Sequence, residues 1–145
     1  MSFAIDVNIL LYASDASSPF NGRAREALTS WVAGPEVFCL AWPTVMSYLR
    51  IATHASIFAN PLSPDEAMAN VGSLVSLPHV RMIAEEDGFW DVYREVAGPV
   101  LPRGPLVPDA HLAAILRQHG VTVLHTNDRD FRRFDFLQLR NPFNE

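Results

Sequence analysis

The stretch 2-SFAIDVNILLYA-13 places an acidic residue inside a run of apolar ones. Its alternating pattern predicts a short buried strand in which Ala4 and Asp6 share one face, followed directly by a helix. A carboxylate within an apolar run is costly unless it has a partner. Taken alone, Asp6 fits a solvated strand end or a cap on the following helix, so its role depends on what the rest of the chain brings beside it.

Strand-like and helix-like segments alternate along the remainder of the chain. Strands are expected at 36–41, 79–83, 121–126 and 135–140. Helices are expected at 8–15, 18–34, 43–54, 63–77, 86–98 and 108–120, with loops at 99–107 and 127–134. This order predicts an α/β fold with a central parallel sheet flanked by helices on both faces, in one domain spanning residues 1–145. Ligands of such sheets bind outside the carboxyl ends of the strands, near a switch in strand order.

The composition limits the possible functions. Apolar residues make up 49% of the 145 residues, which is typical of a globular protein. The chain has no lysine, which excludes a P-loop lysine and a Schiff-base lysine. The net charge of −5 argues against a protein that coats nucleic acid. The single cysteine, Cys39, and the absence of a long apolar run favour a cytoplasmic location without a membrane span.

Three acidic sites that lie far apart in the sequence map to one edge of the predicted sheet. Asp6 ends the first strand, and Asp128 and Asp130 follow the strand at 121–126. Asp109 begins a helix on its apolar stripe, so its side chain is expected over the sheet edge. Each acid alone has an ordinary explanation, because aspartate favours turns and the first turn of helices.

Convergence of these acids indicates a cation. Carboxylates that lie close together raise one another's pKa unless a positive charge lies between them. Oxygen ligands without cysteine or histidine suit Mg²⁺, with Mn²⁺ as the alternative. Such metals commonly activate water for attack on a phosphodiester. The residues therefore predict a metal-dependent nuclease or phosphoryl-transfer site.

The chain also resembles a known family, the PIN-domain ribonucleases, and most closely their VapC-type toxins from bacterial toxin–antitoxin pairs. The resemblance covers nearly the whole chain and rests on four segments in order, AIDVNILLYA, WPTVMSYLRIATH, LVPDAHLAAILRQHG and LHTNDRDFRRF. It implies a PIN-like three-layer sandwich and Mg²⁺- or Mn²⁺-dependent endonucleolytic cleavage of RNA. It further implies a homodimer and a cognate antitoxin that blocks the site.

The resemblance assigns roles to individual residues. Asp6 matches the first acid of the family, Asp109 the acid of the later helix, and Asp128 and Asp130 the final acidic motif. These four are the predicted catalytic residues, with Asp6, Asp109 and Asp128 as metal ligands. Whether Asp128 or Asp130 lies nearer the metal stays open. Asn8 is expected to orient Asp6 or a water molecule behind the ligands.

Ser47 departs from the family pattern, because many PIN nucleases carry a glutamate at this place. Serine is at best a weak ligand or an anchor for water, so weaker metal binding is expected. The alternative function is therefore a catalytically weakened PIN-like module that binds RNA or an antitoxin. An aspartyl phosphatase is disfavoured, because Asn8 stands where these enzymes need a second aspartate. A receiver domain is disfavoured, because it needs a lysine and the chain has none.

Arginines near these motifs are candidate contacts for RNA phosphates. Arg50 lies one turn beyond Ser47, and a solvated surface position is its alternative. Arg129, with Arg132 and Arg133, lies beside the last acidic motif, where pairing with nearby aspartates is the alternative. His111 follows Asp109 by two residues and is therefore expected to face away from it.

Overall fold

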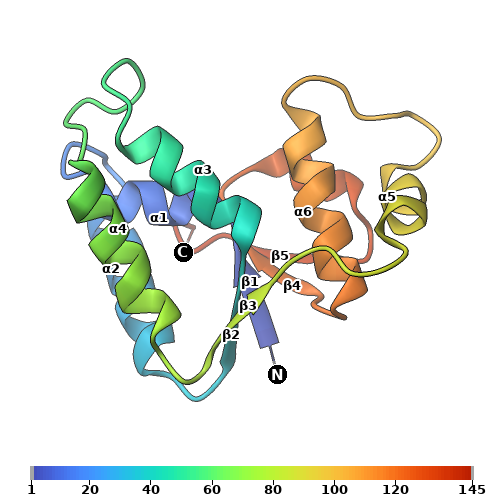
Figure 1. The fold of residues 1–145 in the computed structure, drawn as a ribbon, viewed down its shortest axis with the longest axis horizontal. Helices are drawn as coiled ribbons and strands as arrows, with labels where there is room; N and C mark the ends of the chain where they lie inside the picture. Colours follow the sequence, from blue (N-terminus) through green and yellow to red (C-terminus); the bar gives the residue numbers. More distant parts are fainter. Residues whose placement is uncertain (1, 145) are drawn as a thin grey trace.

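Within residues 2–144, which the computed structural model describes, five parallel strands form a central sheet (Figure 1). The strands are β1 (Ser2–Ile5), β2 (Val37–Ala41), β3 (Val80–Ile83), β4 (Val123–His125) and β5 (Gln138–Arg140). Their order is β3-β2-β1-β4-β5, with Ala4 of β1 aligned with Cys39 on one side and Leu124 on the other. The chain builds the sheet outward from β1 in one direction and later in the other, so the strand order switches between β1 and β4.

Helices cover both faces of this sheet, as Figure 1 shows. One layer contains α1 (Val7–Ser14), α2 (Asn21–Ala33), α3 (Trp42–Ala52) and α4 (Pro64–Val75), and the other contains α5 (Phe89–Ala97) and α6 (Leu106–Gln118). The predicted α/β sandwich with a central parallel sheet is therefore confirmed. No helix in the described part of the chain is long and apolar enough to cross a membrane.

The core has two halves, and β1 contributes to both. Phe3 and Ile5 pack with the layer of α1 to α4, whereas Ala4 packs with α6. The alternation of side chains along a strand explains this division. Small residues on the inner face of α6, including Ala110 and Ala113, are fully buried. The predicted apolar stripe of this helix therefore lies on the sheet and carries Asp109 at its start.

Two segments near the carboxyl ends of the strands differ from the predictions. The helix expected at 108–120 begins at Leu106, inside the stretch expected to be a loop. Pro105 and Pro108 are compatible with this start, because the first N–H groups of a helix have no partner within it. The stretch 127–134, expected to be a loop, contains a 3₁₀ helix, η1 (Arg129–Arg133), which Asp128 caps and in which Phe131 is fully buried.

One half-buried histidine gives the fold a testable dependence on pH. The His125 ring lies 4.4 Å from Trp31 and 5.2 Å from Phe3, between ring centroids. Burial, with a smaller contribution from Arg140, lowers its pKa to about 4. In the unfolded chain, His125 takes up a proton near pH 6.5, whereas in the folded chain it stays neutral down to about pH 4. The contribution of the neutral ring to folding stability is therefore complete above pH 6.5 and is lost as the pH falls towards 4.

We expect wild type to lose about 1–2 kcal/mol more unfolding free energy than His125→Phe between pH 7.5 and 4.5. The phenylalanine ring keeps the aromatic packing but does not titrate. Urea denaturation at both pH values measures the difference. Equal losses in the two proteins would show that His125 does not contribute to the acid sensitivity.

Candidate active site

Asp6 lies at the carboxyl end of β1 and is the N-cap of α1. Its Oδ1 accepts a hydrogen bond of 2.7 Å from the backbone N–H of Val7, and its Oδ2 accepts one of 2.9 Å from the Thr126 hydroxyl. The side chain is buried, and this burial raises its pKa. The helix-capping explanation for Asp6 is thus correct, and the two hydrogen bonds offset part of the cost of burying its charge.

Three further acids converge beside Asp6. Asp109 projects from the first turn of α6, while Asp128 and Asp130 belong to the cap and first turn of η1. One carboxylate oxygen from each of these three residues lies within 4.8 Å of the other two. The Asp128 carboxylate also accepts a 2.9 Å hydrogen bond from the backbone N–H of Asp130. The final acidic motif thus brings both of its aspartates to the cluster.

The electrostatics of this cluster are unfavourable in the metal-free protein. The pKa of Asp109 is raised to about 7, first by burial and then by the charges of Asp128, Asp6 and Asp130. Within residues 2–144, no arginine forms an ion pair with any of the four acids. A set of oxygen donors with excess negative charge fits a hard divalent cation such as Mg²⁺. The donor chemistry does not distinguish Mg²⁺ from Mn²⁺.

A cavity of about 300 Å³ lies between α3 and the start of α6. Asp6 and Asp109 line it, and so does Ser47 of α3, the residue at the place where many PIN nucleases carry a glutamate. Asn8 does not line this cavity. Within the described residues its Oδ1 is buried without a hydrogen-bond partner, and no hydrogen bond joins it to Asp6.

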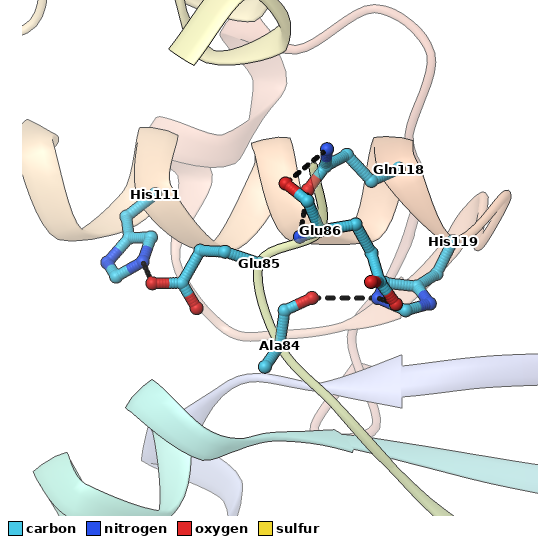
Figure 2. A network of polar contacts seen from close by, with 6 residues as sticks. All are labelled: Ala84, Glu85, Glu86, His111, Gln118 and His119. Atoms are coloured by element: carbon cyan, nitrogen blue, oxygen red, sulfur yellow. Dashed lines mark hydrogen bonds and ion pairs between the residues drawn. The ribbon is translucent and has the colours of Figure 1, made fainter. Parts of the chain in front are cut away.

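His111 and Asp109 both line this cavity, although no hydrogen bond or ion pair joins them among the described residues. The cavity extends along the first turns of α6 from Val107 to Leu112, so more than one side of the helix reaches it. The His111 ring is held at 3.3 Å from Glu85 Oε2 (Figure 2). It also packs edge-on against Phe89. Glu85 therefore orients the ring of a residue that lines the same cavity as Asp6 and Asp109.

The segment 84–86, which follows β3, forms hydrogen bonds with the C-terminal end of α6, as Figure 2 also shows. Gln118 accepts a 2.9 Å hydrogen bond from the backbone N–H of Glu86 and donates to the Glu86 carbonyl at 3.2 Å. The ring of His119 lies 2.8 Å from the Ala84 carbonyl. These contacts fix the far end of the helix that carries Asp109.

Thr126 is a site residue that sequence reasoning missed. It is buried, and its hydroxyl donates to Asp6 and accepts a 3.0 Å hydrogen bond from the backbone N–H of Asp128. It therefore links the acid after β1 to the acid after β4. The available signal was a hydroxyl at the end of a strand, directly before the Asn127–Asp128 pair.

The arginines differ in their surroundings. Arg50 is exposed on α3 and does not line the cavity of the acids. Arg129 and Arg132 are exposed and line a second, polar cavity that adjoins Asp128. Arg133 instead donates to the backbone carbonyls of Ala97 and Val100, so its contacts are structural. Pairing of these arginines with nearby aspartates is not observed among residues 2–144.

Comparison with known proteins identifies the family. The PIN domain model matches residues 3–137. Ribonuclease VapC48 of Mycobacterium tuberculosis is 46% identical over 143 residues, which cover 99% of each chain.

Solved structures share the fold. One is the structure of VapBC2 from Rickettsia felis bound to a DNA fragment from the VapBC2 promoter. It matches with a TM-score of 0.69 at 15% identity, and the match covers 97% of this chain and 98% of that chain. A toxin–antitoxin complex from Klebsiella pneumoniae matches with a TM-score of 0.61 at 17% identity, over 98% of each chain. The match to the family model and the identity with VapC48 show that the chain belongs to the PIN-domain family, as a ribonuclease of the VapC toxin type.

Proposed function

We propose that this ribonuclease cleaves RNA internally with a divalent metal ion, Mg²⁺ or alternatively Mn²⁺, held by Asp6, Asp109 and Asp128. The observation that carries the proposal is the convergence of the Asp109, Asp128 and Asp130 carboxylates to within 4.8 Å, with no arginine ion-paired to them among residues 2–144. Asp130 belongs to this group, and Asp6 lies close enough to raise the pKa of Asp109. All four acids are therefore proposed as catalytic.

The chain's own residues position the substrate and the metal ligands. Asp6 is held by Val7 and Thr126, so one acid of the cluster is fixed before any ligand arrives. A cation bound here would polarise the scissile phosphate and lower the pKa of the attacking water. No side-chain nucleophile is needed, which agrees with the burial of Cys39 in β2. Arg50 and Arg129, both exposed, are proposed to contact RNA phosphates.

The decisive experiment is incubation of the purified protein with cellular RNA in Mg²⁺ or in EDTA. Cleavage is expected in Mg²⁺ only, and a replacement of Asp6 or Asp109 by asparagine is expected to reduce the rate about 10³-fold or more. Asp87→Asn is the matched control, because Asp87 is an exposed acid outside the cluster. Persistence of cleavage in EDTA, or in both asparagine variants, contradicts the metal-dependent mechanism.

We also propose a protein partner and a second copy of the chain. The fold is shared with a toxin subunit solved in a toxin–antitoxin complex, which supports a cognate antitoxin that covers the site. Exposed Trp42 and Met46 lie on α3, the helix that contributes Ser47 to the cavity of the acids, and are available for such contacts. Co-expression with the neighbouring small gene, followed by size-exclusion chromatography with light scattering, tests both the antitoxin and the homodimer.

Ser47 motivates the second candidate function, a PIN-like module with weak catalysis that acts by binding. The Ser47 side chain lines the same cavity as Asp6 and Asp109, so a carboxylate there would join the cluster. Ser47→Glu is expected to lower the Mg²⁺ concentration for half-maximal cleavage about tenfold, since another anionic ligand strengthens cation binding. Ser47→Gln has similar size without the charge and serves as control. A large gain of activity from an inactive wild type would instead support the binding module.

A further inference from the structure

A second cavity adjoins the acid cluster at the carboxyl ends of β4 and β5. Its volume is about 530 Å³, which is within the range of small-molecule sites of roughly 300–1,000 Å³. Thr126 and Asp128 line it, so the cavity begins where the proposed metal site ends. Whatever occupies this cavity therefore lies beside Asp128.

Two asparagines give one wall of the cavity an excess of hydrogen-bond donors. Asn141 Nδ2 donates a 2.9 Å hydrogen bond to Asn127 Oδ1, and Asn141 Oδ1 accepts one of 2.9 Å from the backbone N–H of Phe143. Asn127 Nδ2 in turn lies 3.4 Å from the Tyr12 hydroxyl. Each amide nitrogen carries two N–H groups, and the described residues take only one from each. Among residues 2–144, both amide oxygens therefore accept a hydrogen bond, and one N–H of each amide has no partner.

The rest of the cavity combines charged and apolar side chains. Arg129 and Arg132 line it, are exposed and form no ion pair within residues 2–144, and the exposed Asp135 lines it as well. Buried Phe134 and Leu137 contribute apolar surface to the same cavity. An apolar surface flanked by guanidinium groups suits a flat aromatic ring attached to a phosphate, and an unpaired nucleotide has this chemistry.

We infer that this cavity binds the nucleotide next to the scissile phosphate and selects keto bases. The free amide donors face O6 of guanine or O4 of uracil, and Arg129 and Arg132 hold the adjoining phosphate. Adenine and cytosine place an exocyclic amine at the same position, which would set a donor against a donor. The inference rests on the proposed function, because it takes the cluster that includes Asp128 as the point of cleavage.

Base-selective binding is tested without metal or catalysis, by titrating the four nucleoside monophosphates into ¹⁵N-labelled protein in EDTA. GMP and UMP are expected to shift the side-chain amide resonances of Asn127 and Asn141, with a Kd about tenfold lower than that of AMP or CMP. Arg132→Ala is expected to weaken binding of all four nucleotides by a similar factor. Arg94→Ala, an exposed arginine on α5 away from the cavity, is expected to leave all four Kd values unchanged.

Asn127→Asp tests the donor directly while preserving the fold. An aspartate keeps the oxygen that accepts from Asn141 but replaces the free N–H by an acceptor, so the ratio of keto to amino affinity is expected to fall to about 1 or below. Equal shifts for all four bases, or the same shifts with ribose 5-phosphate alone, would overturn the inference. An acidic peptide can be titrated in the same way. If it shifts the side-chain amide resonances of Asn127 and Asn141 and no nucleotide does, the inference is also overturned, in favour of a protein ligand.

Cleavage separates this inference from the proposed function. With Mg²⁺ and a randomised RNA library, wild type is expected to show a keto preference at one nucleotide beside the cut, and Asn127→Asp to lose it at that nucleotide only. Mg²⁺-dependent cleavage without any such preference contradicts the base site alone. Keto-selective binding in EDTA by a protein that never cleaves RNA contradicts the nuclease mechanism but supports the base site.

Discussion

Replacing Asp109 by asparagine is expected to abolish RNA cleavage and, in the same protein, to raise the free energy of unfolding at pH 8. The folded metal-free protein holds Asp109 at a pKa of about 7, whereas the unfolded chain ionises it near its ordinary value of 3.8. The contribution of protonated Asp109 to the free energy of unfolding is therefore fully present below about pH 4 and is lost as the pH rises through 7. Asparagine at position 109 does not ionise, so the variant avoids this loss of stability. Among the described residues, the substitution breaks no hydrogen bond.

The expected gain at pH 8 is about 1–2 kcal/mol, because solvent screens a carboxylate that is only half buried. Urea denaturation in EDTA at pH 8 and at pH 4 measures it, and the gain should vanish at pH 4. Asp87→Asn, which removes an exposed charge elsewhere, should change neither value by more than about 0.5 kcal/mol. A variant that is less stable than wild type at both pH values would show that Asp109 has a structural role.

Addition of Mg²⁺ should reverse the order of stability at pH 8. A ligand that binds only the folded state stabilises it by mass action, and wild type has the complete set of acids. Asp109→Asn is expected to gain little from Mg²⁺, because it lacks one carboxylate of the converging group. If Mg²⁺ stabilised wild type and Asp109→Asn equally, the metal would bind outside the acid cluster. In the proposed mechanism, the cluster lowers the stability of the metal-free protein and provides a metal site in return.

The sequence was sufficient to predict that the acids meet. Side-chain alternation placed Asp6 at a strand end, the apolar stripe directed Asp109 toward the sheet, and both follow from local periodicity. The carboxyl-end rule for parallel sheets then brought Asp128 to the same edge. These inferences needed only the order of strands and helices, so they did not depend on the exact ends of any element.

The contacts that support the acids were not predictable in the same way. The position of His111 relative to Asp109 depends on how far the cavity extends around α6, and this depends on packing between α3 and α6. Glu85, which orients that ring, is 26 residues away in the sequence. Local periodicity carries no information about such pairs, because tertiary packing alone determines which loop reaches which helix.

Replacing Thr126 by valine is expected to weaken Mg²⁺ binding about 10–100-fold, although Thr126 is not itself a proposed ligand. The valine keeps the shape of the side chain but removes the hydroxyl that bonds both Asp6 and the backbone N–H of Asp128. Asp6 Oδ2 and the backbone N–H of Asp128 then lose this partner, although Oδ1 of Asp6 keeps its bond from Val7, and the unfolding free energy is expected to fall by about 1–3 kcal/mol. The Mg²⁺ concentration for half-maximal cleavage reports the first effect, and urea denaturation in EDTA reports the second.

Thr126→Ser separates the hydroxyl from the methyl group. Serine keeps both hydrogen bonds and loses only a buried methyl, which costs about 1 kcal/mol of stability. Its Mg²⁺ dependence should therefore stay within about twofold of wild type, since the hydroxyl still holds Asp6. If serine and valine weaken Mg²⁺ binding equally, packing rather than the hydroxyl positions the acids. If excess Mg²⁺ restores the maximal rate of Thr126→Val, the hydroxyl acts by arranging the metal ligands and takes no direct part in the reaction.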